Sequence, residues 1–427
     1  MDAKPQKHSI TYILLLILAG EAVFILPFVL ARVFRATVLD VFEINNTELG
    51  FCFSIYGLVA LVSYLFGGPL ADRFPPRKLM GVALVLTALG GLVYANSPSL
   101  VTLQVLYGFW GFTTIFLFWA AMIKATRVWG GEKSQGKAFG FLDGGRGLVG
   151  ALFGALGVFI FSLFAPENGS ELSPKQQAEA FTSVVYYSSA IVAIIGVLVF
   201  FFLKSDVAAE EINREKITVN TIKKVMLLPS VSLLMVIILC AYVGYKITDI
   251  FSLYANVVMG YNEVDAAKTG TFLLFIRPVL GVVIGFLADR SRASVYLMIG
   301  FVLSVFGAIL FASGVLHEGT TLLFFLSIII TAVGVYAARV LYFAVMKEGN
   351  IPLHLTGTAV GVISFIGYTP DIFAGPMIGY FLDGMPGRAG HEAVFWLLAA
   401  FSAVGLGASF LFYRFSLRND KASSLRK

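Results

Sequence analysis

Apolar residues are grouped along the chain in runs of about 20, and short charged or turn-forming segments separate these runs. A helix of that length crosses a hydrocarbon core of roughly 30 Å. Helices are predicted because lipid offers no hydrogen bonds to an open backbone. The pattern predicts twelve spans, at 10–35, 49–71, 79–96, 100–123, 138–165, 181–203, 228–251, 267–288, 294–313, 321–346, 355–382 and 393–413.

Composition supports this assignment, because only 13% of the 427 residues are charged and 58% are hydrophobic. A soluble domain carries roughly 25% charged residues, so this chain has too few to cover a surface in water. The fold class predicted is an all-α polytopic membrane protein. The sequence contains no phosphate-binding Gly-Lys-Ser/Thr loop, no nucleophile–base arrangement and no cluster with metal-ligand spacing. We therefore expect neither an enzyme nor a bound cofactor or metal.

Lysine and arginine are distributed unevenly over the segments that join the spans. The two termini and the loops on their side contain 22 of the 31 Lys and Arg residues, whereas the opposite loops contain five, with Arg32 and Arg35 counted among them. Basic loops remain cytoplasmic, so both termini are predicted to lie in the cytoplasm. The asymmetry also explains the formal net charge of +6 without a nucleic-acid partner.

A six-residue motif occurs twice, each time at the end of the second span of a set of six. The first copy runs from Gly68 to Arg73 and the second from Gly285 to Arg290, in the form G-x-x-x-D-R. Two copies at equivalent positions indicate an internal duplication. A polar segment at 204–224 separates the halves, which predicts bundles at 1–203 and 225–427 joined by a cytoplasmic linker.

The first copy, Gly68-Pro-Leu-Ala-Asp-Arg, resembles the signature that follows the second span in the major facilitator superfamily, although Pro75 stands where the family has glycine. The resemblance extends over nearly the whole chain. It implies two pseudo-symmetric six-helix bundles that work by alternating access. It also implies that acidic and basic residues of this loop and its second copy lock the cytoplasmic side: Asp72, Arg73, Arg77, Asp289 and Arg290. Alternatively, the two arginines of the first copy only fix the topology.

Ionisable residues inside the spans are costly, about 2.5–3.5 kcal/mol each on insertion scales, so each one requires a partner or a function. Eight such residues are Glu21, Asp143, Arg146, Lys246, Asp249, Arg277, Arg339 and Asp371. Spans three, six, nine and twelve contain none, which suggests that they face lipid. Two pairs are spaced i, i+3 on one helix and could neutralise each other: Asp143 with Arg146, and Lys246 with Asp249.

The remaining four residues have no opposite charge three or four positions away, and two of them are arginines. Arginine binds carboxylate, phosphate or sulfonate oxygens two at a time. We therefore predict a secondary transporter for a small anionic solute held by Arg277, Arg146 and Arg339, with help from Lys246 or Arg32. Glu21 or Asp371 would carry a coupling proton in a symporter, and an exchanger would need none. Both would otherwise pair with Arg277 or Arg339 on another helix.

The segments 47–73 and 245–254 resemble the organophosphate:phosphate antiporters of the superfamily. That resemblance implies a phosphate bound between basic residues of spans one and seven, and Arg32 and Lys246 lie near these places. Two alternatives stay open: a lipid or drug exporter whose buried charges are structural, and a transporter-like membrane sensor. The expected partners are the solute, the bilayer and, for a symporter, protons. We expect a functional monomer in a bacterial inner membrane.

Overall fold

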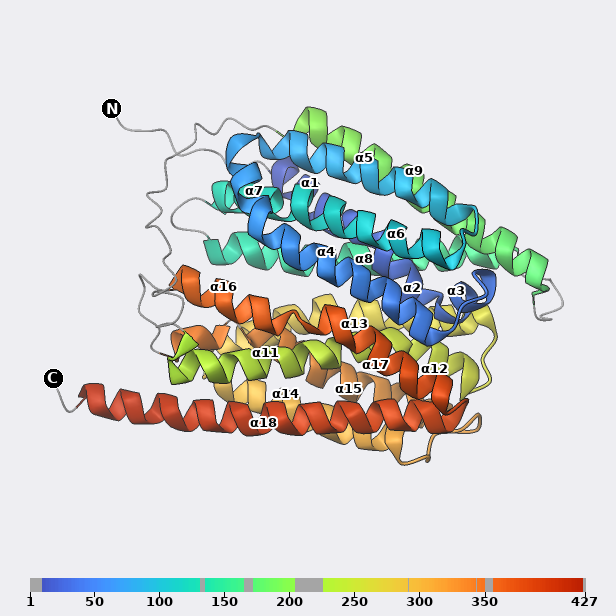
Figure 1. Ribbon diagram of the computed structural model, residues 1–427. Coiled ribbons are helices and arrows are strands. Elements are labelled where there is room, and N and C mark those ends of the chain that lie inside the picture. Colours follow the sequence, from blue (N-terminus) through green and yellow to red (C-terminus); the bar gives the residue numbers. More distant parts are fainter. Residues whose placement is uncertain are drawn as a thin grey trace. The chain divides into compact units, whose positions relative to one another are not determined.

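The computed structural model describes residues 10–130, 135–164, 172–203, 226–290, 292–342, 344–349 and 356–424. Helices with short connecting turns make up this part of the chain, and no strand occurs in it (Figure 1). The predicted linker at 204–224 lies outside the described residues. The prediction of an all-helical membrane fold is confirmed.

Eleven helical segments in the described ranges are long and apolar enough to cross a membrane. The first half contains α1 (Ile10–Phe24), η1 (Ile25–Val29), α2 (Leu30–Val33), α3 (Arg35–Val41), α4 (Asn46–Arg73), α5 (Pro76–Ala95), α6 (Leu100–Gly111), η2 (Phe112–Trp119), α7 (Ala120–Gly130), α8 (Gln135–Ser162) and α9 (Pro174–Phe202). The second half contains α11 (Pro229–Ile247), η3 (Thr248–Ile250), α12 (Phe251–Val257), α13 (Glu263–Arg290), α14 (Ala293–Ala312), α15 (Thr321–Leu341), η4 (Ala344–Lys347), α16 (Thr356–Gly367), α17 (Pro370–Gly384) and α18 (Arg388–Ser424).

The eleventh predicted span, 355–382, differs from the others because it is interrupted. It corresponds to α16 and α17, which have 12 and 15 residues and are each too short to cross a bilayer alone. Pro370 begins α17, and its ring nitrogen carries no hydrogen, so it cannot donate a helical hydrogen bond to the preceding turn. This accounts for the difference between twelve predicted spans and eleven continuous ones.

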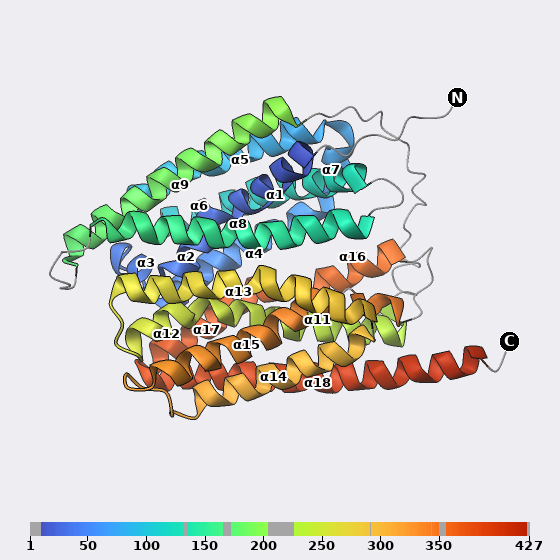
Figure 2. The same ribbon diagram turned by 180° about the vertical axis from the view of Figure 1, so that it is seen from behind.

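The chain forms two compact units, which we call unit 1 and unit 2. Unit 1 comprises Met1–Ile44, Ile55–Glu211 and Gly270–Pro278, and unit 2 comprises Asn45–Ser54, Ile212–Thr269 and Val279–Lys427. Two helices therefore contribute to both units. The beginning of α4 belongs to unit 2 and its remainder to unit 1, while the middle of α13 belongs to unit 1 and its two ends to unit 2. Figure 2 shows the same helices from behind.

Small residues allow the helices of unit 1 to pack closely. A Cβ added to Gly196 of α9 would lie 2.9 Å from the Leu84 side chain of α5, so larger residues would separate these helices. At the end of α5, Tyr94 stacks edge-on against Trp110 with ring centroids 5.4 Å apart. The indole of Trp110 donates a hydrogen bond of 3.1 Å to the carbonyl of Thr87, which satisfies its buried N–H.

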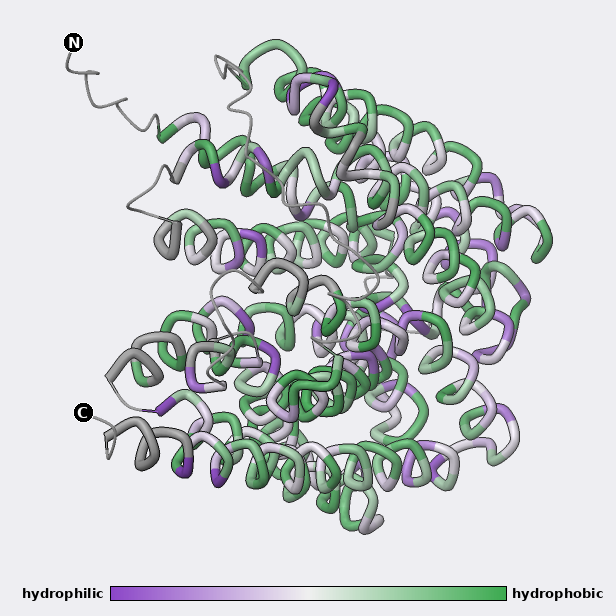
Figure 3. Tube along the Cα trace, turned by 60° about the vertical axis from the view of Figure 1, so that its left-hand side comes forward, coloured by the Kyte–Doolittle hydropathy of each residue, from purple (hydrophilic) through white to green (hydrophobic). Residues whose placement is uncertain are grey.

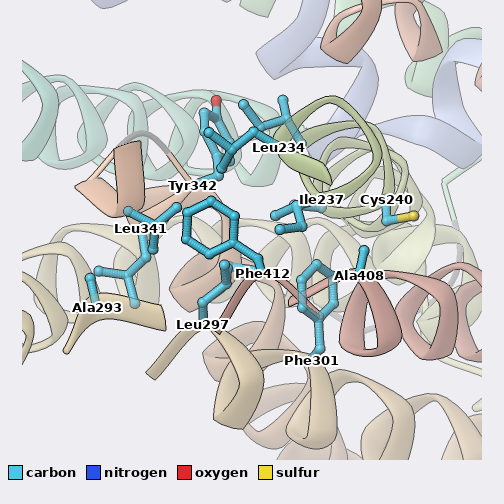
Figure 4. Close-up of a cluster of buried hydrophobic side chains, with 14 of the residues drawn as sticks. Leu234, Ile237, Cys240, Ala293, Leu297, Phe301, Leu341, Tyr342, Ala408 and Phe412 are labelled. Carbon is cyan, nitrogen blue, oxygen red and sulfur yellow. The ribbon is translucent and has the colours of Figure 1, made fainter. Parts of the chain in front are cut away.

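Unit 2 has a continuous apolar core around Phe412 of α18 (Figure 4). Leu234 and Ile237 of α11, Leu297 and Phe301 of α14 and Leu341 of α15 surround it. Close packing of α14 and α15 depends on Gly334, where an added Cβ would lie 2.4 Å from the amide nitrogen of Ser304.

Many large apolar side chains remain exposed on the helices. Figure 3 shows that hydrophobic residues, drawn in green, occupy much of the trace. Leu322, Val282 and Phe201 are 76%, 70% and 67% exposed. Such exposure is unfavourable in water but matches contact with lipid tails.

Two spans of unit 1 contain π-helical segments that the sequence pattern did not predict. The segment η1, which includes Pro27, lies between α1 and α2, and η2 lies between α6 and α7. A π-helical segment widens the turn, changes the direction in which side chains point, and frequently occurs at functional sites. Both segments border the buried charges described below.

The first turn of α4 is held by a carboxylate from α17 within unit 2. Asp383 accepts hydrogen bonds from the backbone amides of Asn46 and Thr47, at 3.1 and 2.6 Å, and from both of their side chains. Nearby, a Cβ added to Gly50 would lie 2.4 Å from the carbonyl carbon of Gly375, so the two backbones are in direct contact. The opposite charge of the carboxylate also suits the helix N-terminus.

Candidate functional site

A buried ion pair joins α11 and α17 in unit 2. Nζ of Lys246 lies 2.6 Å from Oδ1 of Asp371, and the two side chains are 9% and 15% exposed. The hydroxyl of Tyr242 donates to both oxygens of the same carboxylate, each at 3.1 Å. The pair is therefore fixed from two sides, and the interhelical partner of Asp371 is Lys246 rather than one of the arginines.

The local helix geometry explains why these charges are tolerated. Lys246 lies in the last turn of α11, two residues before the 3₁₀ segment η3 begins. Asp371 lies in the first turn of α17, directly after Pro370. A cation at a helix C-terminus and an anion at a helix N-terminus are both stabilised by the helix dipole. The interruption of span eleven thus places an N-terminal helix end inside the protein.

Arg339 lies in the last turn of α15, also in unit 2. Its guanidinium carbon is 3.5 Å from the centroid of the Tyr245 ring and 5.8 Å from that of Tyr242. Nη1 of Arg339 is buried and has no hydrogen-bond partner within the described ranges. The Arg339 side chain forms no salt bridge in those ranges either. Stacking on tyrosine stabilises the cation but does not neutralise it. Arg339 is therefore a shielded positive charge with donors available for a ligand.

Tyrosine rings connect this arginine to the ion pair. The Tyr242 ring centroid lies 5.7 Å from Nζ of Lys246. The Tyr242 ring stacks on Tyr245, with centroids 5.8 Å apart, and meets the Tyr368 ring edge-on at 5.0 Å. The hydroxyls of Tyr368 and Tyr342 are 3.2 Å apart. Tyrosine combines an apolar face with a polar tip, so this cluster offers stacking surface and hydroxyl groups beside two cations.

A second buried ion pair joins α1 and α8 in unit 1. Nε of Arg146 lies 3.3 Å from Oε2 of Glu21, and Nη1 lies 3.7 Å from Oδ1 of Asp143 on the same helix. The guanidinium carbon is 5.4 Å from the Phe24 ring centroid and 5.6 Å from that of Trp119. These two rings border η1 and η2, so the irregular segments position the aromatic contacts of Arg146.

The two pairs have the same separation along the chain, with their charges exchanged. Glu21 and Arg146 are 125 residues apart, and so are Lys246 and Asp371. Spans one and five carry the first pair as acid and base, and spans seven and eleven carry the second as base and acid. The common separation of 125 residues is the sequence signal from which both ion pairs could have been predicted.

Other predicted site residues lie in different surroundings. Arg277 is half-buried in the part of α13 that belongs to unit 1. The next residue, Pro278, packs against Gly147 of α8, where an added Cβ would lie 3.3 Å from the proline ring. Asp249 is buried in η3. Arg32 is buried in α2 at 5% exposure. The expectation that Arg32 and Arg35 occupy an outside loop is wrong, because Arg35 is 3% exposed and begins helix α3.

The predicted gating residues lie where the motif copies end α4 and α13. Arg73 is exposed at the end of α4, and Arg77 is half-buried in the first turn of α5. The side chains of Asp72, Asp289 and Arg290 lie outside the described part of the structure. Lys124 of α7, which no sequence motif marks, donates a hydrogen bond of 2.8 Å to the carbonyl of Ala71 and so caps the end of α4.

Membrane-spanning helices with charged side chains buried in each of two units define a polytopic membrane protein. The sequence profile of the Major Facilitator Superfamily matches residues 10–372, and the chain belongs to that family.

Two relatives from Escherichia coli (strain K12) match over most of their length. The inner membrane protein YqcE is 28% identical over 378 residues, which cover 87% of this chain and 86% of YqcE. The inner membrane protein YihN is 25% identical over 402 residues, which cover 92% of each chain.

Solved structures of transporters share the fold. A bacterial homologue of the human lysosomal transporter Spinster, in an inward-facing and occupied conformation, has a TM-score of 0.71 at 15% identity and covers 98% of this chain and 99% of its own. The nucleoside transporter NupG has a TM-score of 0.70 at 15% identity and covers 94% of this chain and 98% of its own.

Proposed function

We propose that this transporter moves a small anionic solute by alternating access, and that Arg339 provides its principal anion contact. The observation that carries the proposal is the uncompensated guanidinium of Arg339 on the Tyr245 ring. Burying an ionised group without a counter-charge is expensive, so a protein retains such a group for a function. A planar guanidinium binds two oxygens of a carboxylate, phosphate or sulfonate at once.

The two ion pairs have a supporting part in this proposal. Lys246 lies close enough to Tyr242 to share its surroundings with Arg339 and so to help hold the anion. In unit 1, Arg146 and Arg277 are further candidate contacts for the solute. Glu21 or Asp371 would take up a proton in a symporter, whereas an exchanger would use a counter-anion instead. The loop residues Asp72, Arg73, Arg77, Asp289 and Arg290 remain predicted gating residues.

The cellular setting follows from the relatives and the loop charges. YqcE and YihN are named as inner membrane proteins, which supports the same location for this chain. The excess of Lys and Arg on one set of loops supports a cytoplasmic position for both termini. We propose that a single chain suffices for transport.

Ligand-dependent thermal stability of the detergent-purified protein tests the proposal. The panel contains inorganic phosphate, sulfate, nitrate, sugar phosphates, carboxylates, sulfonates, lipids and amphipathic cations. A ligand at about 100 times its dissociation constant stabilises the folded state by about 2.7 kcal/mol, which is readily measured. We expect one class of anion to stabilise the wild-type protein and to have no effect on Arg339→Gln.

Arg292→Gln is the matched control. The Arg292 guanidinium also lies over a tyrosine, 6.0 Å from the ring centroid of Tyr413, but at the start of α14 rather than inside a span. Anion stabilisation should persist in this control. Stabilisation by lipids or amphipathic cations alone, unchanged in Arg339→Gln, would contradict the anion site and favour a lipid or drug exporter. Saturable binding without flux would favour a sensor.

A further inference from the structure

The ion pair between Lys246 and Asp371 lies beside the proposed anion contact, and its geometry differs from that of its counterpart in unit 1. Nζ of Lys246 contacts the Asp371 carboxylate at 2.6 Å, whereas Nε of Arg146 is 3.3 Å from Glu21. Moreover, neither Arg146 Nε nor Glu21 Oε2 has a hydrogen-bond partner of suitable geometry in the described residues. The pair in unit 2 is therefore the tightly held one.

Tyr242 places this tight pair and Arg339 around one ring. Its centroid is 5.7 Å from Nζ of Lys246 and 5.8 Å from the guanidinium carbon of Arg339, while its hydroxyl holds Asp371. Two cations thus share one aromatic neighbour, and of the two only Lys246 contacts a carboxylate in the described part of the chain. A solute anion that binds Arg339 therefore lies near a second cation, Lys246, that is already paired with Asp371.

We propose that Asp371 acts as a resident substitute for the solute's anionic group on Lys246. In the unloaded protein its carboxylate neutralises Lys246, which avoids the cost of a bare buried cation. A small dianion of the phosphate or sulfate type, held first by Arg339, displaces Asp371 and binds both cations. This inference rests on the proposed anion transport and assigns Asp371 the role of an intramolecular competitor that sets affinity.

Competition has a distinctive consequence for binding. Neutralising a residue of a binding site normally weakens binding, but removal of a competitor strengthens it. Asp371→Asn should therefore bind a dianion more tightly than the wild-type protein, by about tenfold, because a charge-assisted hydrogen bond no longer has to be broken. Tyr242→Phe, which keeps both charges and only loosens the carboxylate, should change the affinity in the same direction by a smaller factor.

Sulfate is the probe, and the readout is the sulfate concentration that gives half of the maximal thermal stabilisation. We expect this concentration to decrease in the order wild type, Tyr242→Phe, Asp371→Asn. Adding Lys246→Gln to Asp371→Asn should abolish the gain, since the freed cation is then missing. Asp265→Asn is the matched control, because Asp265 pairs with Lys268 at 2.8 Å on an exposed part of α13 and should leave sulfate binding unchanged.

The outcomes separate this inference from the proposed function. If the wild type binds sulfate as tightly as, or more tightly than, both Asp371→Asn and Tyr242→Phe, the competitor role is overturned and the anion site remains in place. Binding by Asp371→Asn that survives Arg339→Gln would support the competitor role and contradict Arg339 as the principal contact. Sulfate stabilisation of none of these proteins would contradict both, since two freed cations at one ring should hold a dianion.

Discussion

Removal of one partner of the Lys246–Asp371 pair should destabilise the protein far more than removal of both. Lys246→Met leaves the Asp371 carboxylate buried, and among the described residues the Tyr242 hydroxyl is then its one side-chain donor. Breaking a buried pair in this way costs about 3–5 kcal/mol of the free energy of unfolding. The double variant Lys246→Met/Asp371→Asn removes both charges, so we expect it to remain within about 1 kcal/mol of the wild type.

Unfolding of the detergent-solubilised variants, followed by circular dichroism during denaturant titration, gives the coupling energy of the pair. The surface pair Lys268–Asp265 is the control: it has a similar separation of 2.8 Å, but its side chains are 61% and 48% exposed. Exposed pairs contribute about 0.2–1 kcal/mol, so Lys268→Met should have little effect. Equal losses for Lys246→Met and Lys268→Met would refute the reasoning, because they would mean that water screens the inner pair.

Further substitutions test other contacts by the same unfolding measurement. Asp383→Ala removes the carboxylate that caps α4 and should lower the free energy of unfolding by about 2 kcal/mol, the upper value for a helix cap. No loss would show that water replaces the carboxylate. Gly50→Ala should lower the yield of folded protein because its Cβ would overlap the α17 backbone, while Gly68→Ala on the same helix, with open space around it, should be tolerated. Arg146→Gln should destabilise unit 1 by about 3 kcal/mol, and adding Glu21→Gln should restore most of that loss; additive losses would argue against a coupled pair.

The fold was largely predictable from the sequence because the bilayer constrains it so strongly. Apolar runs of about 20 residues must form helices, and the duplicated motif predicted two related halves. The interruption at Pro370 was harder to predict, since both α16 and α17 are apolar enough to be taken as one span. The π-helical segments η1 and η2 were missed because hydropathy does not distinguish them from α-helix.

The site was predicted only in part. The cost of burying charge identified which residues matter, including Arg339 and Asp371, but it could not identify their partners. The i, i+3 spacing correctly suggested a contact between Asp143 and Arg146, yet the shorter contact of Arg146 is with Glu21, 125 residues away. Partners on different helices depend on tertiary packing, which local spacing does not encode.

The central claim is that an anion is transported through contact with Arg339, and solute flux tests it most directly. The protein is reconstituted into liposomes loaded with the anion that gives the largest thermal stabilisation, and exchange against the labelled anion outside is followed over time. We expect saturable uptake by the wild type and by Arg292→Gln, and a loss of at least about tenfold in uptake by folded Arg339→Gln. Equal uptake by wild type and Arg339→Gln, or anion binding without any uptake, would contradict anion transport through Arg339.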